Sequence, residues 1–195
     1  MKITRIVNSF FTSNTFVLTD ENCQDCWLVD VGDMEPILDA IGGRQVRGVL
    51  LTHTHYDHLY GINKLVERFP ECVIYTSQHG KEGLFSDKLN FSRYHDDSIV
   101  FEGKHVEVLE EGDEVSLFPY VVLKAIYTPG HDWSCMSYYT DEIIFTGDSY
   151  IPNIKVVTTL PKSNKQEAQV SLDRILKLCK TRDVYPGHNE IEKHK

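Results

Sequence analysis

Four apolar segments of this sequence end in residue types that bind metal ions in proteins. Each is followed at once by histidine or aspartate: 48–52 by His53-Thr-His-Tyr-Asp-His58, 125–128 by Pro129-Gly-His131, 143–146 by Gly147-Asp148, and 183–185 by Pro186-Gly-His188. Catalytic groups commonly lie on loops at the ends of rigid strands, where a sheet can direct several of them to one point. The pattern therefore predicts one shared metal site.

The spacing within the first of these segments predicts two adjacent groups of ligands. His53 and His55 are two residues apart, so in extended backbone both rings lie on one face. Asp57 and His58 lie where the chain turns into the next predicted helix, which lets them face a second point. Carboxylate and imidazole together suit zinc, manganese or iron, and the motifs contain no thiolate, which argues against a closed structural zinc–cysteine site.

These motifs resemble those of the metallo-β-lactamase-fold hydrolases, close to the glyoxalase II (hydroxyacylglutathione hydrolase) type. The segment His53–His58 matches the family's HxHxDH motif, and the segments ending at His131, Asp148 and His188 match its later metal motifs in order. The resemblance covers nearly the whole chain. It implies an α+β fold, a four-layer αββα sandwich of two mixed sheets flanked by helices, with a binuclear metal site at one edge.

The resemblance also implies a role for each motif residue. The first metal would be held by His53, His55 and His131, and the second by Asp57, His58 and His188, with Asp148 bridging the two. We expect two divalent ions, zinc before iron or manganese, and a bridging hydroxide that attacks a small ester or thioester. As the one catalytic residue besides the ligand set, Asp57 would also orient that nucleophile or carry its proton.

The sequence departs from several members of the family. The main zinc β-lactamases have a cysteine ligand where this chain has Asp148, and flavodiiron proteins have glutamate where it has His55. Glyoxalase II enzymes carry a C-terminal helical domain that binds glutathione, whereas this chain ends seven residues after His188, which leaves the involvement of glutathione open. The family often reads Thr-Pro-Gly after the histidine at His131; Asp132-Trp-Ser134 stands here and is expected to reshape the pocket rim.

Other functions of the same scaffold stay open. A persulfide dioxygenase-like oxidoreductase would use one iron held by His53, His131 and Asp148. The ligand set fits a lactonase, a phosphodiesterase or a nuclease of the RNase Z type equally well, and the acidic charge counts against the nuclease. A non-catalytic metal-binding scaffold is disfavoured because degenerate members usually lose ligands, and all seven are present here.

Hydrophobic periodicity predicts the elements that position these residues. Strands are expected first at 2–7, 15–19, 26–31, 46–52 and 73–76, and later at 98–101, 105–109, 114–117, 121–128, 135–140, 142–145 and 182–185. Helices are expected at 34–41, at 59–69, and from a capping box at Ser163 and Gln166 to about residue 180, with Val170, Ile175, Leu176 and Cys179 as its apolar face. Residues 77–97 read as a polar functional loop.

Composition limits the partners of the protein. The 195 residues predict a single domain over 1–195, and the formal net charge of −9 argues against nucleic acid or an anionic membrane as partner. No leader and no apolar run of 18 residues is found, so we expect a cytoplasmic protein acting on a small molecule. The oligomeric state is left open. Arg93, Lys155, Lys162 and Lys165 flank the motif loops and make an anionic substrate conceivable, although solvated surface is the stronger interpretation.

The remaining cysteines and histidines carry weaker signals. Five cysteines form an odd set typical of a reducing compartment, and Cys23 and Cys26 lack the second pair that a zinc site needs. We therefore expect incidental thiols there. His79 is expected as a solvated loop residue more than a substrate contact, and His95, His105 and His194 as surface residues.

Overall fold

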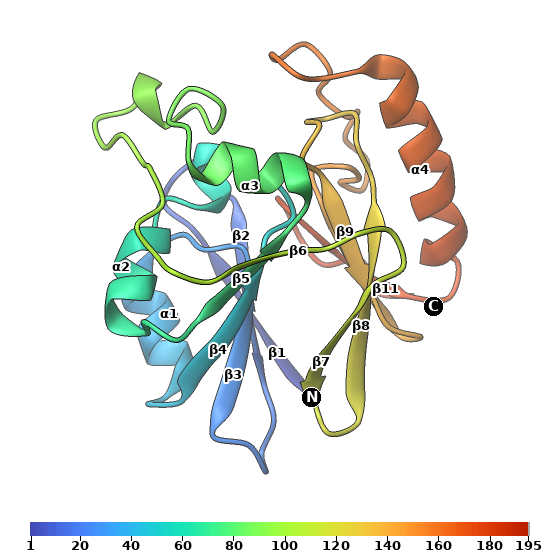
Figure 1. Ribbon diagram of the computed structural model, residues 1–195. Helices are drawn as coiled ribbons and strands as arrows, with labels where there is room; N and C mark the ends of the chain where they lie inside the picture. Colours follow the sequence, from blue (N-terminus) through green and yellow to red (C-terminus); the bar gives the residue numbers. More distant parts are fainter. Residues whose placement is uncertain (195) are drawn as a thin grey trace.

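The computed structural model describes residues 1–194 and contains two β-sheets packed face to face, with helices on their outer faces (Figure 1). The first sheet has the strand order β1-β2-β3-β4-β5-β6. Its strands are β1 (Lys2–Val7), β2 (Asn14–Thr19), β3 (Asp25–Val29), β4 (Gln45–Leu50), β5 (Val73–Thr76) and β6 (Val106–Val108). Strands β1 to β3 are antiparallel and β3 to β6 parallel, so the sheet is mixed.

The second sheet has the order β11-β10-β9-β8-β7 and is also mixed. Its strands are β7 (Glu114–Phe118), β8 (Val121–Tyr127), β9 (Met136–Tyr139), β10 (Ile143–Gly147) and β11 (Asp183–Pro186). Only β10 and β11 pair in parallel, because the connection between them is long enough to hold a helix that crosses back over the sheet.

Four α-helices cover the outer faces of the sheets within the described residues. They are α1 (Met34–Ile41), α2 (Ile62–Arg68), α3 (Gln78–Leu84) and α4 (Lys165–Cys179). Figure 1 shows α1, α2 and α3 on the side of the first sheet and α4 on the side of the second. No helix in residues 1–194 combines the length and the apolar character needed to cross a membrane.

Three apolar layers hold these elements together. Strand residues alternate between them, as the pleat of a β-strand requires: Phe16 and Leu18 of β2 face the second sheet, whereas Val17 faces the helices of the first. In the same way Phe145 of β10 faces the space between the sheets, while Ile144 packs against α4. Two layers between helices and a sheet and one layer between the sheets give the predicted four-layer αββα arrangement.

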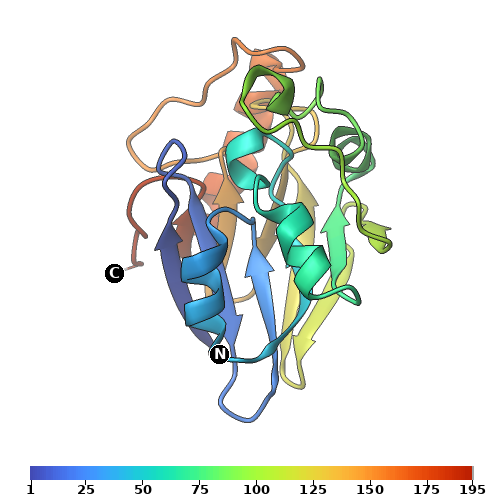
Figure 2. The same ribbon diagram turned by 90° about the vertical axis from the view of Figure 1, so that its left-hand side faces the viewer.

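The loops that carry the motif residues gather at one end of the sandwich. Strands β4, β8, β10 and β11 end immediately before or close to His53, His131, Asp148 and His188. Figures 1 and 2 place the loops after β4, β5 and β10 at the same upper end of the sheets. The prediction that strand ends share one edge is therefore confirmed by the topology.

Helix α4 differs from its predicted form. The cap is Asn164, whose side chain accepts from the backbone N–H groups of Gln166 and Glu167, and Ser163 instead donates to the carbonyl of His131. The predicted apolar face was wrong in two of its four residues, because Val170 and Leu176 are exposed. The face that packs on the sheet follows the helical period through Ala168, Ser171, Ile175 and Leu178.

Helix α3 lies in the segment expected to be a polar loop. Its two glycines led to the prediction of a loop, because glycine is a poor helix former. They are required here by close packing: a Cβ at Gly83 would lie 2.1 Å from Oγ1 of Thr54, and one at Gly80 would lie 1.9 Å from Oγ1 of Thr76. Ser77 caps the helix by accepting from the backbone N–H of Gly80.

Three other predicted boundaries were wrong. β3 stops at Val29 rather than at 31, because Asp30 adopts a left-handed conformation with φ of 58°. The helix expected at 59–69 begins only at Ile62, after a 3₁₀ turn (Tyr56–His58). The segment 98–101 is not a strand; its backbone hydrogen bonds go to Ser92 and to the end of α3 instead of to a neighbouring strand.

Candidate metal centre

The structure brings all seven predicted ligand residues together. His53 and His55 follow β4 in extended backbone, and Asp57 and His58 occupy the 3₁₀ turn, so the first motif presents side chains from two directions. The other three, His131, Asp148 and His188, come from the loops after β8, β10 and β11. Most of these side chains are buried, and the most exposed, His188, is 17% accessible.

Their potential ligand atoms form three overlapping groups, each within 4.8 Å: His53, His55 and His131; His53, His58 and Asp148; and Asp57, His58 and His188. The first and third groups share no residue. Asp148 lies between them, with one carboxylate oxygen 3.6 Å from Nε2 of His131 and 3.4 Å from Nε2 of His188. Its other oxygen is 3.6 Å from Nε2 of His58. The arrangement fits a metal site with Asp148 at its middle.

Several of these atoms are buried without a hydrogen-bond partner. Three of them face the centre of the cluster, namely Nε2 of His53, Nε2 of His58 and Oδ1 of Asp148; the fourth, Nε2 of His55, faces Asp132 instead. Leaving such a polar atom unpaired costs about 1–3 kcal/mol, so buried orphans of this kind are rare. The first three lie close together and are all good metal ligands, so a bound cation would satisfy them together. The residues present therefore fit a metal site.

The charges in the cluster are balanced by protons in the metal-free protein. Burial lowers the pKa of His58, but the carboxylates of Asp57, Asp148 and Asp30 raise it more, to about 9. His188 behaves in the same way: burial lowers its pKa, and hydrogen bonds to Asp148 and Asp57 raise it to about 10. The two imidazoliums thus occupy the place of positive charge that a metal ion would supply.

By the same reasoning, the carboxyl group of Asp148 is ionised and the imidazole ring of His53 is neutral. Burial raises the pKa of Asp148, yet the His58 cation and the hydrogen bond from His188 hold it well below its ordinary value. For His53, burial and the nearby His58 charge hold the pKa well below 6.5. An ionised carboxylate and a neutral imidazole are the protonation states that bind metals.

Each histidine is oriented by a hydrogen bond at its other ring nitrogen, as is usual for metal ligands. Nδ1 of His131 donates to the carbonyl of Val157 at 3.0 Å, and Nδ1 of His188 donates to the carbonyl of Phe11 at 3.1 Å. Nδ1 of His53 lies 3.1 Å from Oγ1 of Thr52. These contacts turn Nε2 of all three rings toward the cluster. Nε2 of His53 has no partner there, Nε2 of His131 lies 3.0 Å from Nδ1 of His55, and Nε2 of His188 lies 3.3 Å from Asp57.

Asp30 is a site residue that the sequence reasoning missed. It is fully buried and accepts from Nδ1 of His58 at 2.8 Å, and from the N–H and the Oγ1 of Thr52 at 2.7 Å each. The available signal was a lone aspartate inside an apolar strand segment, since a buried carboxylate needs partners. In the sequence it read as part of a predicted strand.

The segment Asp132-Trp-Ser134 is divided between the inside and the rim of the site. Asp132 is 2% exposed; its carboxylate lies 3.5 Å from Nε2 of His55 and accepts from the backbone N–H of Ser134 at 2.8 Å. It therefore supports a ligand instead of reshaping the rim. Only Trp133 turns outward, where its ring stacks on His79 at 4.1 Å between centroids.

One of the remaining histidines differs from its expected setting, and a second makes contacts that the sequence did not predict. His79 lies in α3 against Trp133 and is therefore not a freely solvated loop residue. His95 is partly exposed, and its ring also stacks on Tyr56 at 4.2 Å between centroids and contacts Phe10. His105 and His194 are exposed, as expected.

The two cysteines of the N-terminal pair are free thiols outside the cluster. Cys26 is buried, and burial raises the pKa of its thiol to about 12, so it is a poor nucleophile and a poor metal ligand. This agrees with the interpretation of incidental thiols, which no measurement on turnover has tested.

Comparison with known proteins gives consistent relationships. Residues 9–188 match the model of the metallo-beta-lactamase superfamily. A probable metallo-hydrolase of Streptococcus pyogenes serotype M6 is 30% identical, over 96% of this chain and 84% of that protein. The crystal structure of the B3 metallo-beta-lactamase BLEG-1 superposes with a TM-score of 0.85 at 22% identity, covering 97% of this chain and 93% of that one.

A further crystal structure, TTHA1623 in a di-iron-bound form, superposes with a TM-score of 0.80 at 25% identity, covering 97% of this chain and 94% of that one. The match of the family model extends from the β1–β2 turn to His188 and so contains every motif residue described above. With its two mixed sheets, its flanking helices and its cluster of histidines and aspartates at one end, this chain belongs to the metallo-beta-lactamase superfamily.

Proposed function

We propose that this chain is a metal-dependent hydrolase that cleaves a small ester or thioester, in the manner of glyoxalase II. The observation that carries the proposal is the position of Asp148, whose carboxylate lies between His131 on one side and His58 and His188 on the other. A carboxylate in this position can be shared by two cations. A site for a single ion would not need the third ligand group at all.

Under this proposal the seven residues divide into two sets. His53, His55 and His131 hold one ion and Asp57, His58 and His188 the other, with Asp148 shared. Zinc is the first choice, and iron or manganese suits the same donors. The di-iron-bound form of TTHA1623 supports two ions in a related fold. The probable metallo-hydrolase of Streptococcus pyogenes supports hydrolysis as the reaction class.

Two bound divalent ions would polarise the substrate carbonyl and supply an activated water at neutral pH. The chain's own residues do the rest. Oδ2 of Asp57 is nearly equidistant from two histidines: it lies 3.4 Å from Nε2 of His58 and 3.3 Å from Nε2 of His188. We assign it to orienting the attacking water and accepting its proton at Oδ2. Asp30, Asp132 and the carbonyls of Phe11 and Val157 keep the histidine rings in position.

The chief alternative is a persulfide dioxygenase-like oxidation at one iron, which needs only His53, His131 and Asp148. The clustering of Asp57, His58 and His188 favours the two-metal hydrolase, because at a site with one iron these three ionisable groups would bind no metal ion. Lactonase or phosphodiesterase activity uses the same residues and is separated from thioester hydrolysis only by substrate.

We also propose a small-molecule substrate, with neither nucleic acid nor membrane as partner, since the net charge is −9. Activity in the cytoplasm is proposed because all five cysteines are free thiols, which a reducing compartment preserves.

The test combines metal analysis with a substrate panel. Protein loaded separately with zinc, iron and manganese is analysed for metal content and then assayed on thioesters, lactones and phosphodiesters. Two ions per chain with thioester or ester hydrolysis is the expected result. One iron per chain at saturation, with oxygen consumption and sulfite production from a persulfide, would instead establish the oxidative alternative.

A further inference from the structure

The aromatic ring of Phe91 lies against one of the seven clustered residues. Its centroid is 4.9 Å from that of the His55 ring, with 43° between the ring planes. Within the cluster His53 and His58 are fully buried, whereas solvent reaches the side chains of His55 and Asp148. Phe91 itself is half-buried. It therefore lies at the opening of the cluster, with part of its surface exposed.

The packing of the core does not account for this ring, because Phe91 belongs to none of the three apolar layers. Among the described residues its only other aromatic contact is with Tyr94, at 6.4 Å between centroids, and Tyr94 is itself 70% exposed. The cation–π contacts of residues 1–194 do not include it. The ring thus presents a neutral apolar surface beside the cluster.

The backbone of Phe91 adopts a conformation that phenylalanine rarely takes. Its φ of 63° is in the left-handed region, where a non-glycine residue costs roughly 1 kcal/mol or more. Glycine or asparagine would adopt this conformation more cheaply. Residues under such strain persist where the surrounding structure holds them, and they cluster at ligand-binding sites. A phenylalanine at this position points to a use for the ring itself.

The residues on both sides of Phe91 hold it in this conformation. The fully buried side chain of Asn90 donates to the carbonyls of Gly83 at 3.1 Å and of Ile99 at 2.9 Å. Its Oδ1 accepts from the backbone N–H of Ser92 at 2.9 Å. The hydroxyl of Ser92, also fully buried, accepts from the N–H of Ile99 at 2.7 Å. The ring is therefore carried on a fixed backbone, as a specificity site requires.

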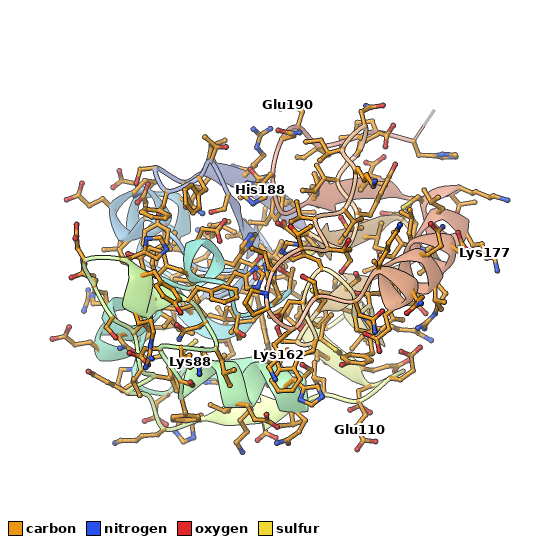
Figure 3. All side chains as sticks on the ribbon, turned by 90° about the horizontal axis from the view of Figure 1, so that it is seen from above. Lys88, Glu110, Lys162, Lys177, His188 and Glu190 are labelled. Atoms are coloured by element: carbon orange, nitrogen blue, oxygen red, sulfur yellow. The ribbon has the colours of Figure 1, made fainter. Side chains whose placement is uncertain are left out.

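The segment that carries Phe91 lies at the same end of the sandwich as the motif loops. Residues 85–99 follow α3, and Figure 1 shows them at the upper end of the molecule. In Figure 3, the view from above, Lys88 of this segment and His188 of the cluster are both labelled within the outline. A substrate that reaches the cluster from this end passes the ring of Phe91.

The position of Asp57 indicates which part of the substrate meets Phe91. Under the proposed function Asp57 accepts the proton of the attacking water, and that proton must then reach the leaving group. Asp57 groups with His58 and His188, whereas His55 belongs to the group that shares no residue with them. We therefore expect the leaving group toward Asp57 and the acyl group toward His55 and Phe91.

We propose that Phe91 is a specificity-determining residue that packs against an apolar acyl group of the substrate. The proposal rests on the proposed function, because it takes the ligand cluster to be where the acyl carbonyl reacts. It adds a substrate class: esters or thioesters whose acyl group is aromatic or bulky and carries no charge. A small acyl group such as acetyl leaves the ring of Phe91 uncovered and gains no apolar contact from it.

The test compares two thioesters with the same leaving group, phenyl thioacetate and S-phenyl 3-phenylpropanethioate, on the metal-loaded full chain. The ratio of their kcat/KM values, aromatic acyl over acetyl, removes effects common to both. In Phe91→Asn this ratio should fall about tenfold, because the ring contact and its buried apolar surface are both lost. The matched control is Phe85→Ala. Phe85 is an exposed aromatic residue of the same segment that contacts Phe101, and its loss should leave the wild-type ratio.

Urea unfolding separates a role in specificity from a role in folding. Phe91→Asn should unfold at about the same urea concentration as the wild type, because relief of the backbone strain offsets the lost ring contact. Phe91→Leu, which keeps an apolar side chain, should restore part of the ratio. Lost stability in Phe91→Asn with an unchanged ratio would overturn the proposal.

A second pair of substrates tests the assignment to the acyl group. Phenyl thioacetate and S-(4-biphenylyl) thioacetate differ only in the leaving group, so the ratio of their kcat/KM values should be the same in Phe91→Asn and in the wild type. A change confined to this pair would overturn the proposal, because Phe91 would then contact the leaving group.

A binding measurement keeps this inference distinct from the proposed function. The carboxylates 3-phenylpropanoate and acetate correspond to the two acyl groups and cannot be hydrolysed. Calorimetry on the zinc-loaded chain should show that the wild type binds 3-phenylpropanoate more tightly than acetate, and that Phe91→Asn binds 3-phenylpropanoate about tenfold more weakly with acetate unchanged. If neither thioester is hydrolysed, the proposed function fails while this comparison still decides the role of Phe91. Equal binding of 3-phenylpropanoate by wild type and Phe91→Asn would overturn the inference.

Discussion

Nδ1 of His58 donates a 2.8 Å hydrogen bond to the fully buried carboxylate of Asp30. The same carboxylate accepts from the backbone N–H and the hydroxyl of Thr52, the residue directly before the first metal motif. One side chain thus fixes the start of the motif and the orientation of its last histidine. Partners of this kind also raise ligand basicity.

Replacing Asp30 by Asn should weaken metal binding about 10- to 100-fold at the site that uses His58, because the amide holds the imidazole less strongly. Competition with a chelator of known affinity measures this. Asp33→Asn is the matched control: Asp33 lies three residues away and bonds to Ser9 and Tyr60, outside the cluster. It should change stability and leave metal affinity as in the wild type. Wild-type affinity in Asp30→Asn would mean that His58 needs no such support.

Asp148→Asn should lose affinity at both metal sites and abolish hydrolysis, since a neutral amide spans two cations poorly. His188→Ala should empty mainly the second site, because the triad of His53, His55 and His131 is untouched. Metal content and steady-state rate are measured for both, with circular dichroism as the check on folding. Retention of two ions and most of the activity in Asp148→Asn would contradict the shared-carboxylate arrangement.

Metal uptake should release protons. In the metal-free protein the pKa of His58 is raised from 6.5 to about 9, and that of His188 to about 10. Between pH 7 and 8 both rings are therefore protonated and must lose their protons to become ligands. Calorimetry in buffers of different ionisation enthalpy should give a release of at least two protons for full occupancy, two from the rings and a further one where a bound water ionises, and apparent affinity should fall as the pH is lowered.

The same shifts predict a pH dependence of the metal-free fold. Because both pKa values are raised above the unfolded value, the imidazolium–carboxylate contacts stabilise the fold fully below about pH 6.5 and are lost as the pH rises through about 9 to 10. Urea unfolding of chelated protein should show falling stability over that interval, and His188→Gln should reduce the fall. A flat profile between pH 7 and 10 would rule out charged histidines in this cluster.

Gly83→Ala should destabilise the protein by roughly 1–3 kcal/mol, although alanine normally stabilises a helix. The added Cβ would lie 2.1 Å from Oγ1 of Thr54, between His53 and His55. Thr54→Ala combined with Gly83→Ala should recover part of the loss, which urea unfolding of both single variants and the double variant would measure as a coupling energy. Additive effects would show that the two residues are not in contact.

The sequence predicted the fold class through its resemblance to a known family, and it identified the seven clustered residues through local signals. Apolar segments followed by glycine and a ligand-type residue identify strand ends, and the spacing of His53, His55, Asp57 and His58 lies within one short stretch. Four such motifs in this order are specific to the family that the sequence resembles. The roles of these residues as ligands remain a proposal that metal analysis must test.

Other features were decided only by the tertiary structure. The partners that orient the rings are distant in sequence: Asp30 is 28 residues from His58, Val157 is 26 from His131, and Phe11 is 177 from His188. Two of the three act through a backbone carbonyl, which every residue type possesses, so no residue pattern could have marked them.

Helix α3 and the contacts of Trp133 were likewise decided by the tertiary structure. Gly80 and Gly83 favour a loop by propensity, and only the close approach of α3 to Thr76 and Thr54 explains why glycine is used in a helix. Trp133, His79 and Lys162 lie far apart in the sequence and meet because three different connections end over the same strand ends. Long-range packing selected their conformations, and local sequence carries no record of that packing.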